Sequence, residues 1–175
     1  MAAVLGLAAP SSDRFPAFVL ENYDGRPITL ETLAGTTTLV VPTYAKCVAA
    51  CPVVTFFLQQ LDDALGAPAH VRYLLVSVQP TEDTRAEIVS HFAKHDIDPA
   101  ADPRWLFANG PTGHIDRFLA EAGIDVERTP VDGGFLVDHT IRVWVIGSSG
   151  SIAATFDTYF WNDEEMHRAM RDATD

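Results

Sequence analysis

A chain of 175 residues with 47% hydrophobic and 21% charged residues can bury one sizeable core without the help of a disulfide. Its net charge of −12 repels phosphate groups and anionic lipid headgroups, so the composition argues against binding to nucleic acid or to a membrane surface. The sequence has no run of about 18 or more apolar residues, so no transmembrane helix is predicted. We expect residues 1–14 to form a flexible amino-terminal segment and residues 15–175 to form a single domain.

The first predicted elements form a β-hairpin. Residues 15–20 are typical of a short strand, Asp24-Gly25 is a strong hairpin-turn signal, and residues 28–30 provide the return strand. One helical turn over 31–35 ends at a glycine. The uninterrupted, β-branched run 36–41 then predicts a strand that is buried on both faces.

Helices and strands alternate through the rest of the chain. We predict an apolar helix over 53–65, a buried strand over 71–78, an amphipathic helix over 84–95, a short strand over 105–108, a helix from 112 or 113 to 122, a hairpin of 140–146 and 152–156, and a terminal helix capped by Asn162 or Asp163. This order predicts an α/β fold with one central mixed sheet and helices on both faces.

The only two cysteines, Cys47 and Cys51, lie between the 36–41 strand and the helix that follows. Pro52 is tolerated in a first helical turn, so it places Cys51 near the helix cap and Cys47 in the preceding turn. The free N–H groups and dipole of a helix start stabilise a thiolate, and Lys46 adds to this effect. Two kinds of chemistry suit such a pair, namely dithiol–disulfide exchange and the binding of a soft metal ion. We consider a pair of inert, half-buried thiols the lesser alternative.

The spacing of the cysteines permits both kinds of chemistry. Thioredoxin-type oxidoreductases usually have two residues between their cysteines, whereas this chain has three. Peroxiredoxins place a threonine three residues before the reactive cysteine, and that position is Tyr44 here.

Six histidines are candidates for a third metal ligand. His91 and His95 have the spacing of a metal pair on one helix face, but Glu87 and Lys94 share that face, which we therefore expect to point to solvent. We also expect His70, His114 and His167 to lie on the surface or at a helix cap. His139 differs, because it follows Asp138 and the glycine-rich stretch 131–134 at the entry to a strongly apolar strand. Strand-end residues can face a helix start across one sheet edge, so His139 is the candidate ligand.

Several motifs together resemble the Sco (SenC/PrrC) family of thioredoxin-like copper proteins. They are Cys47-x-x-x-Cys51-Pro52, the strand and loop Leu75-Val76-Ser77-Val78-Gln79-Pro80-Thr81-Glu82-Asp83-Thr84, and Val137-Asp138-His139-Thr140, in this order. The amino-terminal region 18–30 and Leu33-x-Gly35 fit the family as well. The resemblance covers residues 15–165.

The resemblance implies a thioredoxin-like central mixed sheet flanked by helices, with an amino-terminal β-hairpin extension. It also implies copper, as Cu(I) or Cu(II), bound by Cys47, Cys51 and His139. The implied function is that of a metallochaperone that assembles the copper site of cytochrome c oxidase, with thiol–disulfide reduction by Cys47 and Cys51 as a further activity. The implied partners are the copper-site subunit of the oxidase or another copper chaperone, and no small-molecule substrate is evident. The implied location is periplasmic, or that of a membrane-anchored extracytoplasmic domain.

This chain departs from the family pattern near the cysteines. Gln79 stands where the family usually has an aspartate, which removes a carboxylate near the site and is expected to change the hydrogen bonds around a metal. Ala45-Lys46 replaces a threonine followed by an aromatic residue or histidine, Val48 replaces a common proline, and the late hairpin turn is 147–150 instead of Asp-Pro-Asp-Gly.

Two other functions remain open. One is a metal-independent thiol–disulfide oxidoreductase, in which Cys47 attacks and Cys51 resolves. The other is a copper- or redox-responsive signalling module that keeps the metal site but transfers neither metal nor electrons.

Overall fold

The computed structural model describes residues 14–46 and 51–174. Its main sheet has seven strands in the order β2-β1-β5-β4-β3-β8-β9. Strands β3, β4 and β5 run parallel to one another, and the remaining pairs are antiparallel. The strands are β1 (Val19–Asn22), β2 (Pro27–Thr29), β3 (Thr37–Thr43), β4 (Val71–Ser77), β5 (Trp105–Asn109), β8 (Val143–Ile146) and β9 (Ile152–Phe156).

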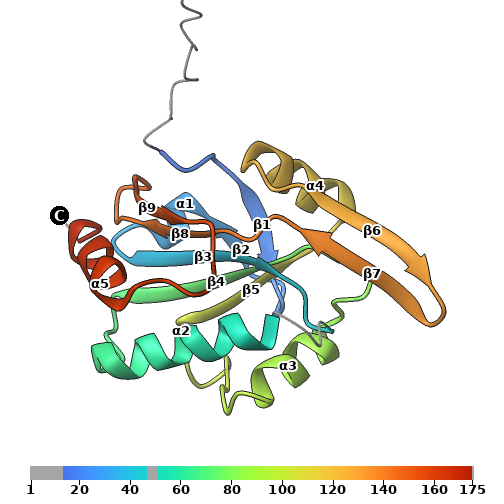
Figure 1. Cartoon of the computed structure of the whole chain (residues 1–175), viewed down its shortest axis with the longest axis horizontal. Helices are drawn as coiled ribbons and strands as arrows, with labels where there is room; N and C mark the ends of the chain where they lie inside the picture. The colour runs from blue at the N-terminus through green and yellow to red at the C-terminus, as the bar shows by residue number, and fades with distance from the viewer. Residues whose placement is uncertain (1–13, 47–50, 175) are drawn as a thin grey trace, which may run out of the picture.

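Helices pack on both faces of this sheet (Figure 1). They are α1 (Leu30–Leu33), α2 (Cys51–Leu65), α3 (Arg85–Ala93), α4 (Thr112–Glu121) and α5 (Asp163–Asp172). Buried side chains of α2, α3 and α5 belong to one hydrophobic cluster, and those of α1 and α4 belong to a second. The predicted α/β arrangement is therefore confirmed. Within the described part of the chain, no helix is long and apolar enough to cross a bilayer.

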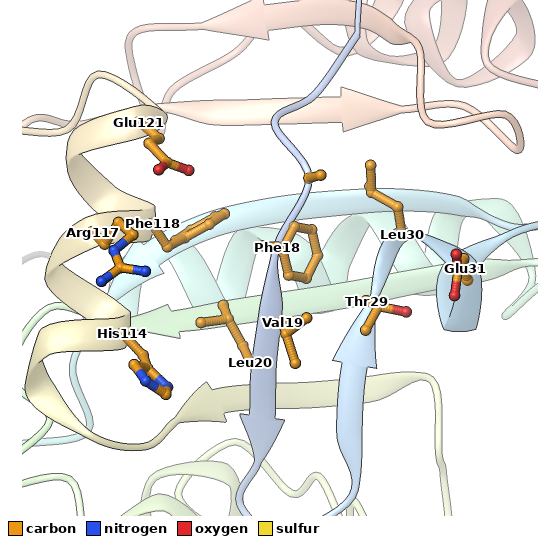
Figure 2. A pocket seen from close by; sticks show the side chains of 11 residues that line it. Phe18, Val19, Leu20, Thr29, Leu30, Glu31, His114, Arg117, Phe118 and Glu121 are labelled. Atoms are coloured by element: carbon orange, nitrogen blue, oxygen red, sulfur yellow. The ribbon is translucent and has the colours of Figure 1, made fainter.

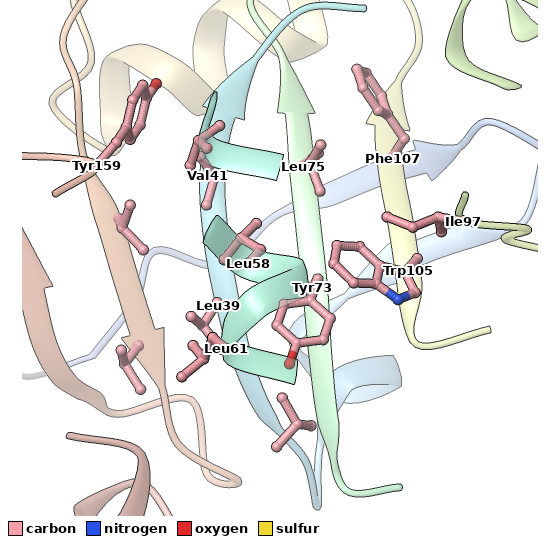
Figure 3. Packing of buried hydrophobic residues seen from close by; sticks show 14 of the residues in the cluster. Leu39, Val41, Leu58, Leu61, Tyr73, Leu75, Ile97, Trp105, Phe107 and Tyr159 are labelled. Carbon is pink, nitrogen blue, oxygen red and sulfur yellow. The ribbon is translucent and has the colours of Figure 1, made fainter. Parts of the chain in front are cut away.

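The central strands divide their side chains between the two clusters. All seven residues of β3 are buried. Because successive side chains of a strand point to opposite faces, Leu39 and Val41 join the cluster beneath α2, whereas Val40 joins the one beneath α4. Figure 3 shows Leu58 and Leu61 of α2 lying over β3. The prediction that the run 36–41 forms a strand buried on both faces is therefore confirmed.

The amino-terminal hairpin is confirmed and forms an edge of the main sheet. Strand β1 pairs with β2 through Leu20 and Ile28, and the turn between them contains Gly25 at φ +88°. Its other side pairs with β5. The hairpin therefore extends the central sheet by two strands.

A second, two-stranded sheet was not predicted. Strands β6 (Val126–Val131) and β7 (Gly134–His139) pair with each other and not with the main sheet. The glycine-rich stretch that we predicted as a loop is the turn of this hairpin, and the following core strand begins at Val143 rather than at residue 140. Most hairpin residues are exposed or half-buried, so the sequence has no clear apolar alternation there.

Candidate metal centre

The cysteine segment leaves the carboxyl end of β3. This strand ends at Thr43, opposite Ser77 at the end of its parallel neighbour β4. Helix α2 begins at Cys51 with Pro52 as its second residue, as the sequence predicted. Cys47 and the side chain of Cys51 lie outside the described residues, so their roles as ligands or as a redox pair stay predictions.

A buried carboxylate holds the start of this segment. Asp83 is fully buried in the turn before α3, and its Oδ1 accepts a hydrogen bond of 2.8 Å from the backbone N–H of Ala45. Its Oδ2 accepts a second from the hydroxyl of Ser77. Burial raises the pKa of Asp83 to about 6, although the hydrogen bonds from Ser77 and Ala45 oppose the rise. At neutral pH Asp83 therefore carries a charge that these donors stabilise.

The prediction that His91 faces solvent is wrong. His91 is 2% exposed, and its Nε2 lies 2.9 Å from the hydroxyl of Thr55 on α2. Burial lowers its pKa to about 4, helped by the nearby charge of His95. The helix face that carries Glu87 is polar in the sequence, and we therefore expected it to face solvent. Helix α2 packs against the part of this face that carries His91, and it contributes the polar side chain of Thr55 there. Imidazole can be buried there because Thr55 gives it a partner.

His139 is the last residue of β7, not the first residue of a core strand. It is half-buried, and its Nδ1 lies 3.0 Å from the backbone oxygen of Thr140. A carbonyl oxygen can only accept, so Nδ1 carries the proton of the neutral ring. The other nitrogen, Nε2, then has its lone pair directed away from this bond. A backbone carbonyl orients many metal-binding histidines in this way.

The hairpin that carries His139 is tied to the strand ends beside the cysteines. Arg128 lies on the same face of the hairpin as His139, and its Nε donates to the backbone oxygen of Val78 at 2.8 Å. The N–H of Val78 in turn donates to the oxygen of Thr43, also at 2.8 Å. Tyr44, three residues before Cys47, packs against the same hydrophobic cluster as Val126, which pairs with His139.

The described residues alone do not complete a metal site. Among them, no group of three or more His, Cys, Asp or Glu side chains is placed to hold a metal ion. The predicted ligand set also requires the sulfur atoms of Cys47 and Cys51, which the structure does not describe. The chemistry of the set fits copper, since thiolates prefer Cu(I) and imidazole binds both oxidation states.

Gln79 lies in the loop directly after β4. It is 1% exposed, its backbone N–H donates to the Ser77 hydroxyl, and its Nε2 has no hydrogen-bond partner among the described residues. A buried amide without a partner is uncommon and costs about 1–3 kcal/mol. Where the resemblance implies a carboxylate, this chain thus has a buried amide donor that no described residue satisfies.

Sequence reasoning did not single out Asp83 or Thr55, and it placed His91 on the surface. Asp83 was quoted only as part of a motif, and Thr55 only as part of an apolar helix. Their contacts join residues 38 and 36 positions apart, and a single sequence contains no signal for such pairs. His70 and His114 are exposed as expected, and His167 is half-buried.

A separate groove of about 560 Å³ lies between the amino-terminal hairpin and α4. Figure 2 shows Phe18 and Phe118 at its base and His114, Arg117 and Glu121 along the α4 side. His139 is not among the described residues that line it.

Comparisons with known proteins agree with the fold and the motifs. A family model described as SCO1/SenC matches residues 8–175. The SCO1 protein homolog of Bacillus subtilis (strain 168) is 25% identical over 142 residues, which cover 80% of this chain and 72% of that protein.

Two solved structures show how closely the fold is shared. Copper-bound ScoI of Bradyrhizobium japonicum superposes with a TM-score of 0.74 at 23% identity, over 91% of this chain and 97% of that one. A SCO1/SenC family lipoprotein from Bacillus anthracis gives a TM-score of 0.77 at 21% identity, over 91% and 94% of the two chains. The chain has the thioredoxin-like fold of these proteins, and it belongs to the SCO1/SenC family.

Proposed function

We propose that this protein binds one copper ion through Cys47, Cys51 and His139 and delivers it to another protein. The observation that carries this proposal is the orientation of His139. Its Nδ1–H is engaged by the Thr140 carbonyl, which leaves Nε2 as the nitrogen for a metal, on a hairpin tied to the strand ends beside the cysteine segment.

Copper is the cargo in this proposal. Two thiolates and one imidazole suit Cu(I), and three ligands release a metal more readily than a closed four-ligand site. By family resemblance, the receiving protein is the copper-site subunit of a cytochrome c oxidase or another copper chaperone. The family resemblance also leads us to propose a location outside the cytoplasm. We further propose that residues 15–175 act as one domain.

Titration with Cu(I) under anaerobic conditions tests the ligand set. The reduced protein should bind one equivalent, and Cys47→Ser, Cys51→Ser and His139→Ala should each weaken the affinity at least tenfold in competition with a Cu(I) chelator. His114→Ala, on the exposed surface of α4, is the matched control and should bind like the wild type. Unchanged affinity in all three ligand variants would rule out the site.

A transfer assay tests the delivery role. The copper-loaded protein should pass its metal to the metal-free, reduced copper domain of an oxidase subunit within minutes, and both proteins can be followed by their metal content after separation. Tight copper binding without any transfer would favour a copper-responsive signalling module instead.

We also propose that the two cysteines reduce a disulfide in the partner. The thiolate of Cys47 would attack the partner's disulfide, and Cys51 would then displace the mixed disulfide. This leaves a Cys47–Cys51 disulfide and two partner thiols, with two electrons and two protons transferred. Lys46 directly precedes Cys47 in the sequence, and a positive charge close in the chain favours the thiolate form of the attacking cysteine. Equilibration of the metal-free protein with glutathione measures the potential, and a dithiol that glutathione disulfide cannot oxidise would exclude a reversible role.

A further inference from the structure

Aromatic rings from α2 and from the loop between β9 and α5 pack together at the surface. They belong to Phe56, Phe57, Phe160 and Trp161, which we call the aromatic patch. The ring of Phe57 lies at the centre, with its centroid 5.5 to 6.0 Å from each of the other three, in the edge-on geometry that aromatic pairs favour. Phe160 is 72% exposed and Phe56 is 48% exposed, whereas Phe57 and Trp161 are half-buried.

The loop that carries Phe160 is fixed on both sides of this residue. Before it, the buried Tyr159 donates a hydrogen bond of 3.2 Å from its hydroxyl to the backbone oxygen of Pro42 in β3. After it, Asn162 caps α5 by accepting from the backbone N–H of Glu165. Phe160 itself belongs to neither hydrophobic cluster. Its ring is therefore held at the surface by a fixed loop and is not needed to fill the core.

Exposure of this kind is typical of protein interfaces. Single apolar side chains are common on protein surfaces, but contiguous apolar patches usually mark a binding site. Aromatic rings contribute much of the binding energy at such sites, because they bury a large area and have few rotatable bonds. Phe56 and Phe160 are exposed enough to contribute in this way, and both pack against Phe57.

Carboxylates border the aromatic patch on the side of α5. The stretch 157–165 has no Lys or Arg, but it contains four exposed acidic residues, namely Asp157, Asp163, Glu164 and Glu165. Arg142 pairs with Asp157, and Arg168 lies 3.7 Å from Glu164. Among the described residues, Asp163 and Glu165 have no salt bridge. The start of α5 stabilises the charges of its first turn, so the fold holds them without cationic partners.

This acidic border selects the kind of partner that fits. A protein surface with an apolar centre and with Lys or Arg around it would complement both the rings and the carboxylates. A second copy of this chain would bring the same carboxylates and a net charge of −12, so the two copies would repel each other. Anionic lipid headgroups would be repelled by the same charge. The patch therefore fits a basic protein surface.

The aromatic patch lies at the edge of the sheet where β3 ends. Strand β8 is antiparallel to both β3 and β9, so β3 and β9 end at the same edge, and β8 begins there. Figure 1 shows the loop that follows β9 passing along α2 on its way to α5. His139 precedes the start of β8 by four residues. A protein docked on the patch would therefore face the end of the sheet to which His139 is joined.

We propose that the aromatic patch is the docking surface for the protein that receives the copper ion, and that this partner presents apolar side chains bordered by Lys or Arg. The copper-accepting role of the partner rests on the proposed function. The patch and its border consist of described residues alone.

Binding of two synthetic peptides to the metal-free, reduced protein tests the surface itself. One peptide forms an amphipathic helix of Leu and Lys, and the other has Glu in place of every Lys. We expect the Leu–Lys peptide to shift the NMR signals of the Phe56, Phe160 and Trp161 rings, and the Leu–Glu peptide to leave them unchanged. Phe160→Ala should weaken binding of the Leu–Lys peptide about fivefold or more. Val19→Ala is the control and should bind like the wild type, since Val19 is 71% exposed but lines the groove between the amino-terminal hairpin and α4.

Copper transfer tests the role of the surface. The rate of transfer to the metal-free, reduced copper domain of an oxidase subunit is measured at increasing concentrations of that domain. We expect Phe160→Ala to raise the concentration that gives half of the maximal rate about fivefold or more, while the maximal rate and the affinity for Cu(I) stay unchanged. Val19→Ala should again match the wild type.

The salt dependence of the same reaction tests the carboxylates. In the wild type, the concentration of the copper domain that gives half of the maximal rate should rise with ionic strength, because salt screens the attraction between exposed charges. In a double variant with Asp163→Asn and Glu165→Gln this rise should be smaller, since two of the charges are gone. Equal salt dependence of the two proteins would contradict a basic partner surface at this border.

The possible failures have different meanings. Wild-type transfer kinetics in Phe160→Ala, or a Leu–Lys peptide that leaves the rings of the patch unshifted, would overturn the docking surface. A wild-type dimer in the analytical ultracentrifuge that is lost in Phe160→Ala would assign the patch to a second copy instead. A wild-type protein that binds no Cu(I) would refute the proposed function, and the peptide titration would still decide whether the patch binds a basic surface.

Discussion

Folding shifts the pKa values of Asp83 and His91 in opposite directions. Burial raises the pKa of Asp83 from 3.8 to about 6 and lowers that of His91 from 6.5 to about 4. Asp83 therefore contributes stability that is present below about pH 4 and is lost as the pH rises through 6. His91 contributes stability that is present above about pH 6.5 and is lost as the pH falls through 4. Between these limits the two contributions largely offset each other.

Single variants should expose these opposing slopes. Relative to the wild type, Asp83→Asn should lose about 3 kcal/mol of unfolding free energy as the pH falls from about 6.5 to 4, because only the His91 contribution remains. His91→Gln should gain a similar amount over the same range. Urea unfolding at a series of pH values measures both. If the plots of unfolding free energy against pH stay parallel to that of the wild type, burial does not shift the pKa of either group.

The lack of a side chain at Gly147 allows the end of the carboxyl-terminal helix to lie close to the sheet. A Cβ atom on Gly147 would lie 2.9 Å from the backbone oxygen of Ala173 and 3.0 Å from the hydroxyl of Ser151. We expect Gly147→Ala to destabilise the protein by about 1–3 kcal/mol, since the nearest atom is backbone and cannot rotate away. Gly113 in α4 has open space around its Cβ position, so Gly113→Ala should stabilise by up to about 1 kcal/mol. Thermal and urea unfolding distinguish the two, and equal shifts would contradict the packing argument.

At the scale of elements, one buried ion pair connects α2 to the neighbouring strands. Asp62 of α2 accepts from the hydroxyl of Tyr73 on β4 at 2.9 Å and from both terminal nitrogens of Arg104, just before β5. Asp62 is 6% exposed. Burial, followed by the charge of Asp62, raises the pKa of Tyr73, so its hydroxyl stays a donor at any ordinary pH.

Removing this carboxylate should be costly. We expect Asp62→Ala to lower the unfolding free energy by about 1–3 kcal/mol, because the buried hydroxyl of Tyr73 loses its partner while Arg104 keeps its ion pair with Asp102. Asp157→Ala is the control, since Asp157 pairs with Arg142 while 67% exposed and should change stability by less than about 1 kcal/mol. Chemical denaturation measures both, and a similar small effect for the two variants would show that the buried pair is no stronger than the surface one.

Element prediction succeeded where burial was continuous and failed where polar groups pack on each other. The apolar runs of β3 and β4 identified strands covered on both faces. The inner face of α3 was misjudged, because His91 shares a helix face with polar residues and is buried through its contact with Thr55 of α2. A single sequence contains no signal for such long-range polar pairs. The β6–β7 hairpin was missed for a related reason, since its mixed exposure leaves no clear alternation.

At the scale of the whole molecule, sequence motifs identified the family, whereas periodicity predicted only the individual elements. The order of the cysteine, Asp83-Thr84 and His139 motifs identified the family, which the match over residues 8–175 confirms. The parallel strands β3 and β4 end side by side, so the segments that follow them leave the sheet at the same edge. The groove beneath α4 had no counterpart in the sequence analysis, since it depends on how α4 crosses the amino-terminal hairpin.

The separate two-stranded sheet has a consequence for how members of the family can diverge. Strands β6 and β7 pair with each other and not with the seven-stranded sheet. Inserting or deleting residues in their turn at 132–133 would therefore alter the length of this ribbon without shifting the register of any core strand. The exposed surface of this ribbon is thus free to vary in evolution, while the register of the core strands stays unchanged.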